Sequence, residues 1–145
     1  MSTVKDILLQ KGQQVWYVTP ETTLRDALKL MAAKNIGAVV VLDGHDVVGI
    51  ISERDYARRV VTSESLSLDD PVRTVMTAPV YYVEPDNTVE ECMNLMTAKH
   101  FRHLPVMTGQ DLIGLVSIGD VVKQILSEKE REIESLEDYI WVNMI

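Results

Sequence analysis

Hydrophobic positions follow two alternating spacings along this chain, and the alternation occurs twice. Leu24, Ala27, Leu28 and Met31 lie at i, i+3, i+4 and i+7, which is the spacing of one buried helical face. Short apolar runs bounded by turn signals indicate strands. The first half predicts strands at 15–18, 38–42 and 47–51 and helices beginning near 24 and 52. The second half predicts strands at 80–83, 104–107 and 112–116 and helices beginning near 89 and 117.

The chain is an internal duplication. With a shift of 65 positions, residues 15–59 align without a gap on residues 80–124, and fifteen of the 45 pairs are identical. One copy is too small to bury both faces of its own sheet. We therefore expect an α+β fold in which two β-α-β-β-α repeats pack sheet to sheet around a pseudo-two-fold axis. Such an axis creates two equivalent clefts, where a ligand would sit.

The repeats divide the chain into three parts: a first repeat with an N-terminal helix at 1–62, a second repeat at 63–126, and a helical tail at 127–145. The N-terminal segment is amphipathic and is expected to pack across a cleft. In the tail, Ile133, Leu136, Ile140 and Met144 form one helical stripe with Trp141 beside it. This stripe either packs back on its own domain or forms a dimer contact.

The junctions between the last strand and the last helix of each repeat carry the candidate chemistry. At 49–55 and 114–120, a Gly, two apolar residues and a Ser are followed three positions later by an Asp. Such a Ser and Asp form a capping box, and capping alone would explain them. A helix N-terminus also attracts phosphate, and an Asp one turn into the helix can accept hydrogen bonds from two ribose hydroxyls. Both interpretations stay open on the residues alone.

The paired junctions, together with residues 99–106 and 71–77, resemble the CBS domain family. The resemblance covers roughly residues 1–126 and implies a non-catalytic module that binds AMP, ADP, ATP, NAD or S-adenosylmethionine between its repeats. It also implies the residues of each cleft. The first cleft would use Ser52, Arg54 and Asp55, with Met76, Tyr81, Phe101, Arg102 and His103 opposite. The second would use Ser117, Gly119 and Asp120, with Trp16, Ile36, Gly37 and Ala38 opposite.

The two expected clefts differ in charge. Arg54, Arg102 and His103 favour a phosphorylated ligand in the first cleft. The second lacks an assigned cation, so we expect it to bind more weakly, to take an uncharged adenosine or to stay empty. The resulting hypothesis is nucleotide sensing by a homodimer that signals to an unknown effector protein. The alternative is a ligand-free dimerisation and interaction module.

Composition and charge narrow the remaining possibilities. The net charge of −8 argues against nucleic acid and anionic membranes. We find no nucleophile–base pair, metal-ligand cluster or phosphate-binding glycine loop in the sequence, so we expect neither an enzyme nor a metal site. Arg58 and Arg59 either extend the phosphate contacts or form a solvated helix face. Cys92, the only cysteine, is expected to be buried, and the expected compartment is the cytoplasm.

Overall fold

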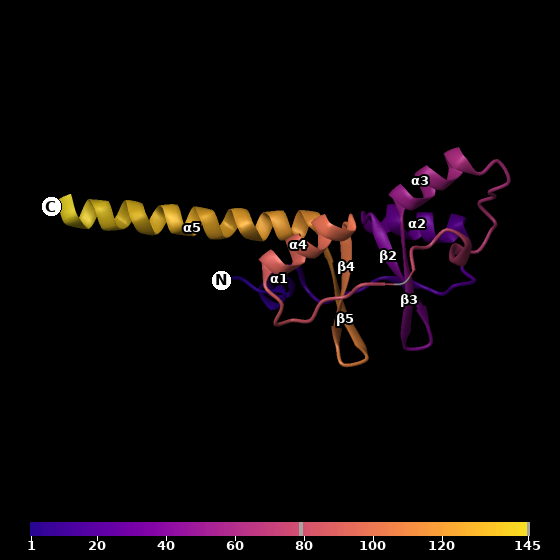
Figure 1. The fold of residues 1–145 in the computed structure, drawn as a ribbon, viewed down its shortest axis with the longest axis horizontal. Helices are drawn as coiled ribbons and strands as arrows, with labels where there is room; N and C mark the ends of the chain where they lie inside the picture. The colour runs from indigo at the N-terminus through magenta and orange to yellow at the C-terminus, as the bar shows by residue number, and fades with distance from the viewer. Residues whose placement is uncertain (79, 145) are drawn as a thin grey trace.

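The computed structural model describes residues 1–78 and 80–144, except for the side chains of residues 141–144. Two small sheets lie at the centre, with helices around them and one long helix extending away (Figure 1). The α+β fold expected from the sequence is confirmed. The first repeat comprises β1 (Tyr17–Val18), α2 (Leu24–Lys34), β2 (Ala38–Asp43), β3 (Asp46–Ser52) and α3 (Glu53–Thr62). The second comprises α4 (Val89–Lys99), β4 (His103–Thr108), β5 (Asp111–Ser117) and α5 (Ile118–Met144). Helix α1 (Val4–Lys11) precedes the first repeat, and the short 3-10 helix η1 (Val72–Thr74) lies between the repeats.

The first strand expected in the second repeat, at residues 80–83, is absent. In the first repeat β1 pairs in parallel with β2, and the Val40 N–H donates to the Trp16 carbonyl. The residue equivalent to Val40 is Pro105, which has no N–H to donate. Only one parallel bridge remains there, between Val83 and Val106. A single proline therefore accounts for the prediction that was wrong.

Each repeat is completed by a segment that precedes the other repeat in the sequence. Helix α1 packs into the core of the second repeat, where Leu8 covers Gly114 so closely that an added Cβ would lie 2.6 Å from its Cδ2. Backbone bridges join Thr3 to Thr88. In the first repeat the same role falls to residues 66–76, with a bridge from Thr23 to Pro71. The two cores are thus formed by exchanged segments.

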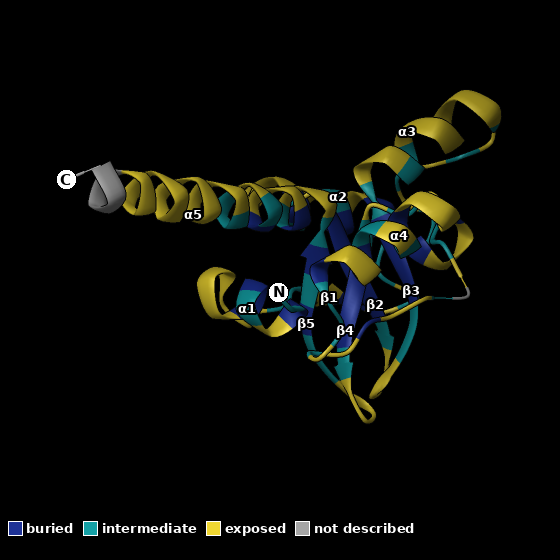
Figure 2. Ribbon diagram, turned by 60° about the vertical axis from the view of Figure 1, so that its left-hand side comes forward, coloured by how far each residue is buried: buried dark blue, intermediate teal, exposed yellow. Residues whose placement is uncertain are grey.

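Helix α5 begins against the second repeat and continues beyond it. Val121 and Gln124 are buried, and Gln124 donates to the Ser2 hydroxyl. Residues 129–140 are exposed on every side (Figure 2). Of the two interpretations of the tail stripe, packing back on the domain is therefore wrong for Ile133, Leu136 and Ile140. The side chains of Trp141 and Met144 are not among those that the structure describes.

Among the described residues, no helix combines the length and apolar character needed to cross a bilayer. The helix α5 is long enough, but its many charged residues between 128 and 138 make it too polar to lie in a bilayer.

Candidate functional site

The turn from β3 into α3 places two polar side chains at a helix N-terminus. The Ser52 hydroxyl accepts from the Asp55 N–H at 3.0 Å, and Asp55 Oδ2 accepts from the Ser52 N–H at 3.2 Å. Thr77 donates its hydroxyl to the same Oδ2 at 3.4 Å. Within the described part of the chain, all the hydrogen bonds to Asp55 go to Oδ2. Its Oδ1 stays available to a ligand even though the capping box is complete.

A cavity of about 350 Å³ opens beside this helix start, between the two repeats. Its size lies at the lower end of the range for small-molecule sites. The first repeat contributes the N-terminal turn of α3, and the second contributes the loop between α4 and β4. The lining residues are Gly37, Ile50, Ser52, Glu53, Arg54, Asp55, Arg58, Thr77, Val80, Tyr81, His100, Phe101, Arg102 and His103.

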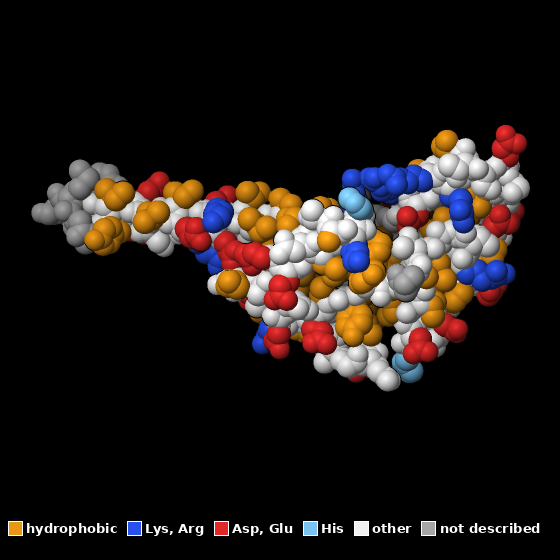
Figure 3. Space-filling model, viewed as in Figure 1, with side chains coloured by type: hydrophobic (Ala, Val, Ile, Leu, Met, Phe, Trp, Pro, Cys, Tyr) orange, Lys and Arg blue, Asp and Glu red, His pale blue; other side chains and the backbone are white. Residues whose placement is uncertain are grey.

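Three arginines around the cavity have no anionic partner. Among the described residues, neither Arg54 nor Arg58 nor Arg102 lies in an ion pair. Repulsion from Arg102, and then from Arg58, lowers the pKa of the Arg54 guanidinium. Basic side chains gather beside a histidine at this edge of the molecule (Figure 3). The arrangement leaves the cavity with uncompensated positive charge at a helix N-terminus, which is an anion-binding environment.

His103 lies between the two strand-to-helix junctions. Its imidazole is close to Gly37 of the first repeat, with Nε2 3.9 Å from the position of an added Cβ. Burial lowers the pKa of His103, and the charges of Lys11 and Arg102 act in the same direction, against Asp120 and Asp55. The neutral imidazole is therefore favoured in the folded protein.

Aromatic side chains form the opposite wall of the cavity. The rings of Tyr81 and Phe101 are tilted by 45° with centroids 5.5 Å apart. The Lys99 ammonium lies 5.2 Å from the Tyr81 centroid, close enough for a cation–π contact. A flat, apolar ring such as a nucleobase has aromatic surfaces to contact on this side.

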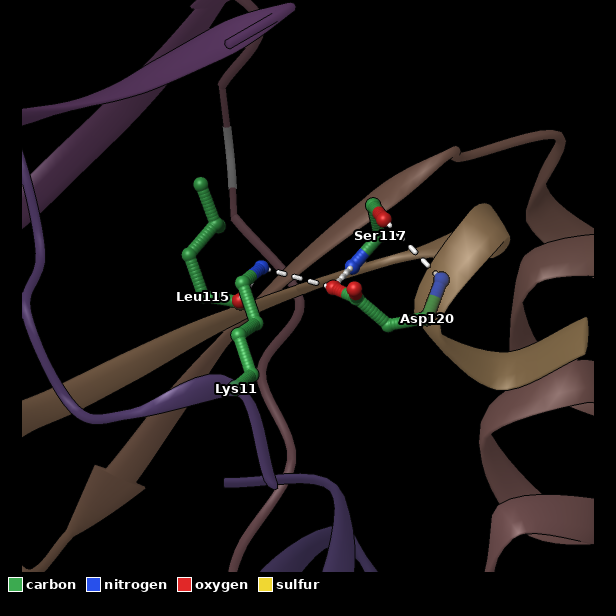
Figure 4. A network of polar contacts seen from close by, with 4 residues as sticks. All are labelled: Lys11, Leu115, Ser117 and Asp120. Atoms are coloured by element: carbon green, nitrogen blue, oxygen red, sulfur yellow. Dashed lines mark hydrogen bonds and ion pairs between the residues drawn. The ribbon is translucent and has the colours of Figure 1, made fainter. Parts of the chain in front are cut away.

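The second junction, from β5 into α5, has the same capping box but a different neighbour. Ser117 and Asp120 exchange hydrogen bonds of 2.8 and 3.2 Å. The Lys11 ammonium, from α1, donates to Asp120 Oδ2 at 2.6 Å and to the Leu115 carbonyl at 2.7 Å (Figure 4). Burial acts to raise the pKa of Asp120, but the hydrogen bonds from Lys11 and Ser117 outweigh it and lower the pKa. The carboxylate equivalent to Asp55 is thus already bound by the chain's own lysine.

Most residues expected in the first cleft line the cavity, but Met76 does not. Met76 packs against β3 instead, where an added Cβ on Gly49 would lie 2.5 Å from its Sδ. Of the residues expected in the second cleft, Gly37 lines the first cavity and Ala38 is buried in β2. Trp16 and Ile36 pack against the first core, and Trp16 also carries Lys34 above its ring at 4.3 Å. Ser117, Gly119 and Asp120 contribute nothing to the cavity.

Sequence reasoning gave Arg58 too little weight and overlooked Lys11. Arg58 lies one helical turn after Arg54 and lines the cavity, whereas Arg59 donates to the Thr74 carbonyl at 2.8 Å. The i, i+4 spacing of the two arginines was the available signal. Lys11 had no such signal, because its partner Asp120 is far away in the sequence.

Two histidines three positions apart, His100 and His103, do not form a metal-binding pair on one helix face. His100 is the left-handed C-cap of α4, and His103 begins β4. Cys92 is fully buried, and burial raises the pKa of its thiol to about 11. Within the described residues, no group of three or more potential ligand side chains is arranged to hold a metal ion.

Comparisons with known proteins agree with this architecture. The CBS domain model matches residues 4–62 and 72–127. The CBS domain-containing protein CBSX3, mitochondrial, of Arabidopsis thaliana is 36% identical, over 96% of this chain and 72% of its own length. A CBS-domain protein from Burkholderia ambifaria is 50% identical with a TM-score of 0.82, over 87% of this chain and 95% of that one. CBSX2, crystallised in complex with AMP, is 28% identical with a TM-score of 0.71, over 89% of this chain and 99% of that one. This chain belongs to the CBS domain family, as a pair of CBS domains.

Proposed function

We propose that this chain is a non-catalytic sensor that binds an adenine nucleotide in the cavity between its two CBS domains and signals its occupancy to a partner protein. The observation that carries the proposal is a set of three arginines around the N-terminus of α3, Arg54, Arg58 and Arg102, that have no ion-pair partner among the described residues. A phosphate there would accept hydrogen bonds from guanidinium groups and lie at the positive end of the helix. AMP, ADP, ATP and NAD all carry the required phosphate.

The other parts of an adenine nucleotide also have partners in this cavity. Asp55 Oδ1 is an acceptor for the ribose hydroxyls, and the aromatic pair Tyr81 and Phe101 offers a surface for the base. CBSX2, the AMP complex described above, is a relative in which such a ligand is bound. S-adenosylmethionine has adenosine but no phosphate, so it would leave the arginines unpaired, and we rank it below the nucleotides.

The proposal places one nucleotide on each chain, in the first cleft. The second cleft has Lys11 on the carboxylate that a ribose would need. A ribose that bridges both carboxylate oxygens of Asp120 must displace that ammonium from Oδ2 and from the Leu115 carbonyl, whereas Oδ1 accepts no hydrogen bond within the described residues. We also propose the cytoplasm as the compartment, in which the free, buried thiol of Cys92 would stay reduced.

The test compares AMP with adenosine by isothermal titration calorimetry. Arg102→Gln should weaken AMP binding about tenfold or more, because a charge-assisted hydrogen bond contributes about 1.5–3 kcal/mol. The same variant should leave adenosine binding nearly unchanged. Arg25→Gln is the matched control, since Arg25 lies on α2 and pairs with Asp69 at 3.5 Å. Equal losses for AMP and adenosine would contradict the placement of the phosphate.

A second variant tests the ribose contact. Asp55→Asn keeps one oxygen to cap α3 and replaces the other by an amide, which no longer accepts. Both AMP and adenosine should then bind more weakly, whereas Asp120→Asn should leave the first cleft unaffected. If Asp55→Asn bound both ligands as tightly as the wild type, the site would be assigned wrongly.

A ligand-free interaction module is the second candidate function. The completed capping boxes at Ser52/Asp55 and Ser117/Asp120 favour it, because they give both residues a purely structural role. A thermal-shift series with AMP, ADP, ATP, NAD and S-adenosylmethionine separates the two. A ligand at 100 times its dissociation constant stabilises the fold by about 2.7 kcal/mol. No shift with any compound would support the interaction module.

A further inference from the structure

Two neighbouring arginines on α3, Arg58 and Arg59, have different surroundings. The Arg59 guanidinium donates to the Thr74 carbonyl at 2.8 Å and does not line the cavity. The Arg58 side chain lines the cavity and forms no hydrogen bond or ion pair with any described residue. The fold therefore holds one of these cations in place and leaves the other available to a ligand.

The other two arginines of the cavity suffice for one phosphate. Arg54 lies in the first turn of α3, and Arg102 lies in the loop between α4 and β4. The pKa of the Arg54 guanidinium is lowered most by Arg102 and next by Arg58, and only Asp55 acts in the opposite direction. Arg54 is thus surrounded by an excess of positive charge. A guanidinium can donate two parallel hydrogen bonds to a phosphate, so Arg54 and Arg102 have enough donors for the three terminal oxygens of one phosphate.

Arg58 lies one helical turn further along α3 than Arg54. Side chains at this i, i+4 spacing begin about 5–6 Å apart on the same helix face. Adjacent phosphates of a diphosphate share a bridging oxygen, so two arginines at this spacing can contact two such phosphates. The carboxylates that line the cavity, Glu53 and Asp55, lie in the first turn of α3, and neither forms an ion pair with an arginine within the described residues. A second phosphate placed at Arg58 therefore lies one turn away from them.

From this arrangement we propose that Arg58 binds a second phosphate and thereby makes the cavity prefer ADP to AMP. The inference rests on the proposed function, because it places the first phosphate between Arg54 and Arg102. ADP carries one more negative charge than AMP and gives the third arginine an anionic partner. The Arg58 side chain is exposed, so water screens the contact. We therefore expect a moderate preference, about fivefold in the dissociation constant.

Isothermal titration calorimetry with AMP and ADP, in a buffer free of divalent cations, tests this preference. The wild type should bind ADP about fivefold more tightly than AMP. Arg58→Gln should weaken ADP binding about fivefold more than AMP binding, so that the preference disappears. Arg59→Gln removes the same charge from the same helix but outside the cavity, and it should keep the preference. Both positions are exposed, and a cooperative thermal transition in each variant checks that the fold survives.

The outcomes of the titrations separate the role of Arg58 from the proposed function. Equal affinities of the wild type for AMP and ADP would overturn that role while leaving the nucleotide site in place. Equal losses of AMP and ADP affinity in Arg58→Gln would do the same. If the wild type bound neither nucleotide, the site and the role of Arg58 would both be refuted.

Phosphorus NMR of bound ADP determines which phosphate each arginine contacts. Arg58→Lys replaces a two-pronged guanidinium by a single ammonium, so it should shift the resonance of the β-phosphorus far more than that of the α-phosphorus. Arg102→Lys is the matched variant and should shift the α-phosphorus more. If Arg58→Lys shifted the α-phosphorus as much as the β-phosphorus, Arg58 would contact the first phosphate and the inference would fail.

Discussion

Replacing Lys11 by Met tests whether the chain itself keeps the second cleft closed. Lys11 makes two short contacts, to Asp120 and to the Leu115 carbonyl, at 2.6 and 2.7 Å. The side chains of Lys11 and Asp120 are 38% and 22% exposed, so water screens the pair in part. Exposed ion pairs contribute about 0.2–1 kcal/mol, and the second hydrogen bond places this one near the upper end, at about 1 kcal/mol. Lys11→Met should lower the melting temperature by about 3 °C.

The same free energy sets the effect on ligand binding. A ribose that takes both carboxylate oxygens of Asp120 in the second cleft of the wild type gives up about 1 kcal/mol to displace Lys11 from Oδ2, which is a factor of about five in affinity. Lys11→Met should therefore strengthen adenosine binding at the second cleft about fivefold, with the first cleft unchanged. Adenosine is the better probe because it has no phosphate that would respond to the lost positive charge.

Calorimetry with adenosine measures both sites, and Lys5→Met is the control. Lys5 lies exposed on the same helix and carries the same charge. The stability difference between the wild type and Lys11→Met should be full above pH 4, the ordinary range of an Asp pKa, and should shrink as pH falls through the lowered pKa of Asp120. If Lys11→Met bound adenosine with unchanged or lower affinity at the second cleft, Lys11 would not be its competitor.

Two further predictions concern stability, measured by thermal or urea unfolding. Burial lowers the pKa of His103, so as pH falls below about 6.5 the unfolded state gains a proton before the folded state does, and the free energy of unfolding decreases. His103→Gln should make the free energy of unfolding depend less steeply on pH in this range. An unchanged pH dependence in the variant would contradict this role of His103. Gly49→Ala should lower the free energy of unfolding by about 1 kcal/mol or more, because its Cβ would lie 2.5 and 2.9 Å from Sδ and Cγ of Met76, which must move, and 3.2 Å from the Thr77 carbonyl. Gly119→Ala is the matched change without a close contact, since its nearest neighbour, the Ser117 hydroxyl, would lie at an ordinary 3.6 Å, and it should leave the free energy of unfolding unchanged or slightly raised; equal effects of the two alanines would show that close packing at Gly49 does not matter.

The duplicated hydrophobic pattern predicted the fold well because it depends on local spacing. The buried faces of α2 and α4, the strand pairs and the capping serines could be predicted, since each is set by neighbours within a few residues. The missing strand at residues 80–83 could also have been foreseen from Pro105. The missing N–H of Pro105 removes a strand only if Pro105 is known to face residues 80–83. The alignment of the repeats placed it there, opposite the same segment as Val40 in the first repeat, but the difference between Val40 and Pro105 was not taken into account.

The candidate site was harder to predict where long-range packing decides it. The arginine cluster follows from a shared helix face and a neighbouring loop, and both were visible in the sequence. Gly37 was assigned to the second cleft by the resemblance to the CBS domain family, yet it lines the first cavity because its carbonyl accepts from Glu53 N–H at the start of α3. Lys11 reaches Asp120 only because α1 packs on the other repeat, and no local pattern encodes that contact.

The exchanged segments make the two repeats mutually dependent. Residues 4–8 complete the second repeat, and residues 66–76 complete the first. A break in the chain near residue 64 would therefore produce two fragments, each of which retains a piece of the other's core and lacks a piece of its own. We therefore expect neither fragment to fold alone, whereas the two together contain both cores. Since the cavity between the repeats is lined by residues from both fragments, only their reassembly would restore it.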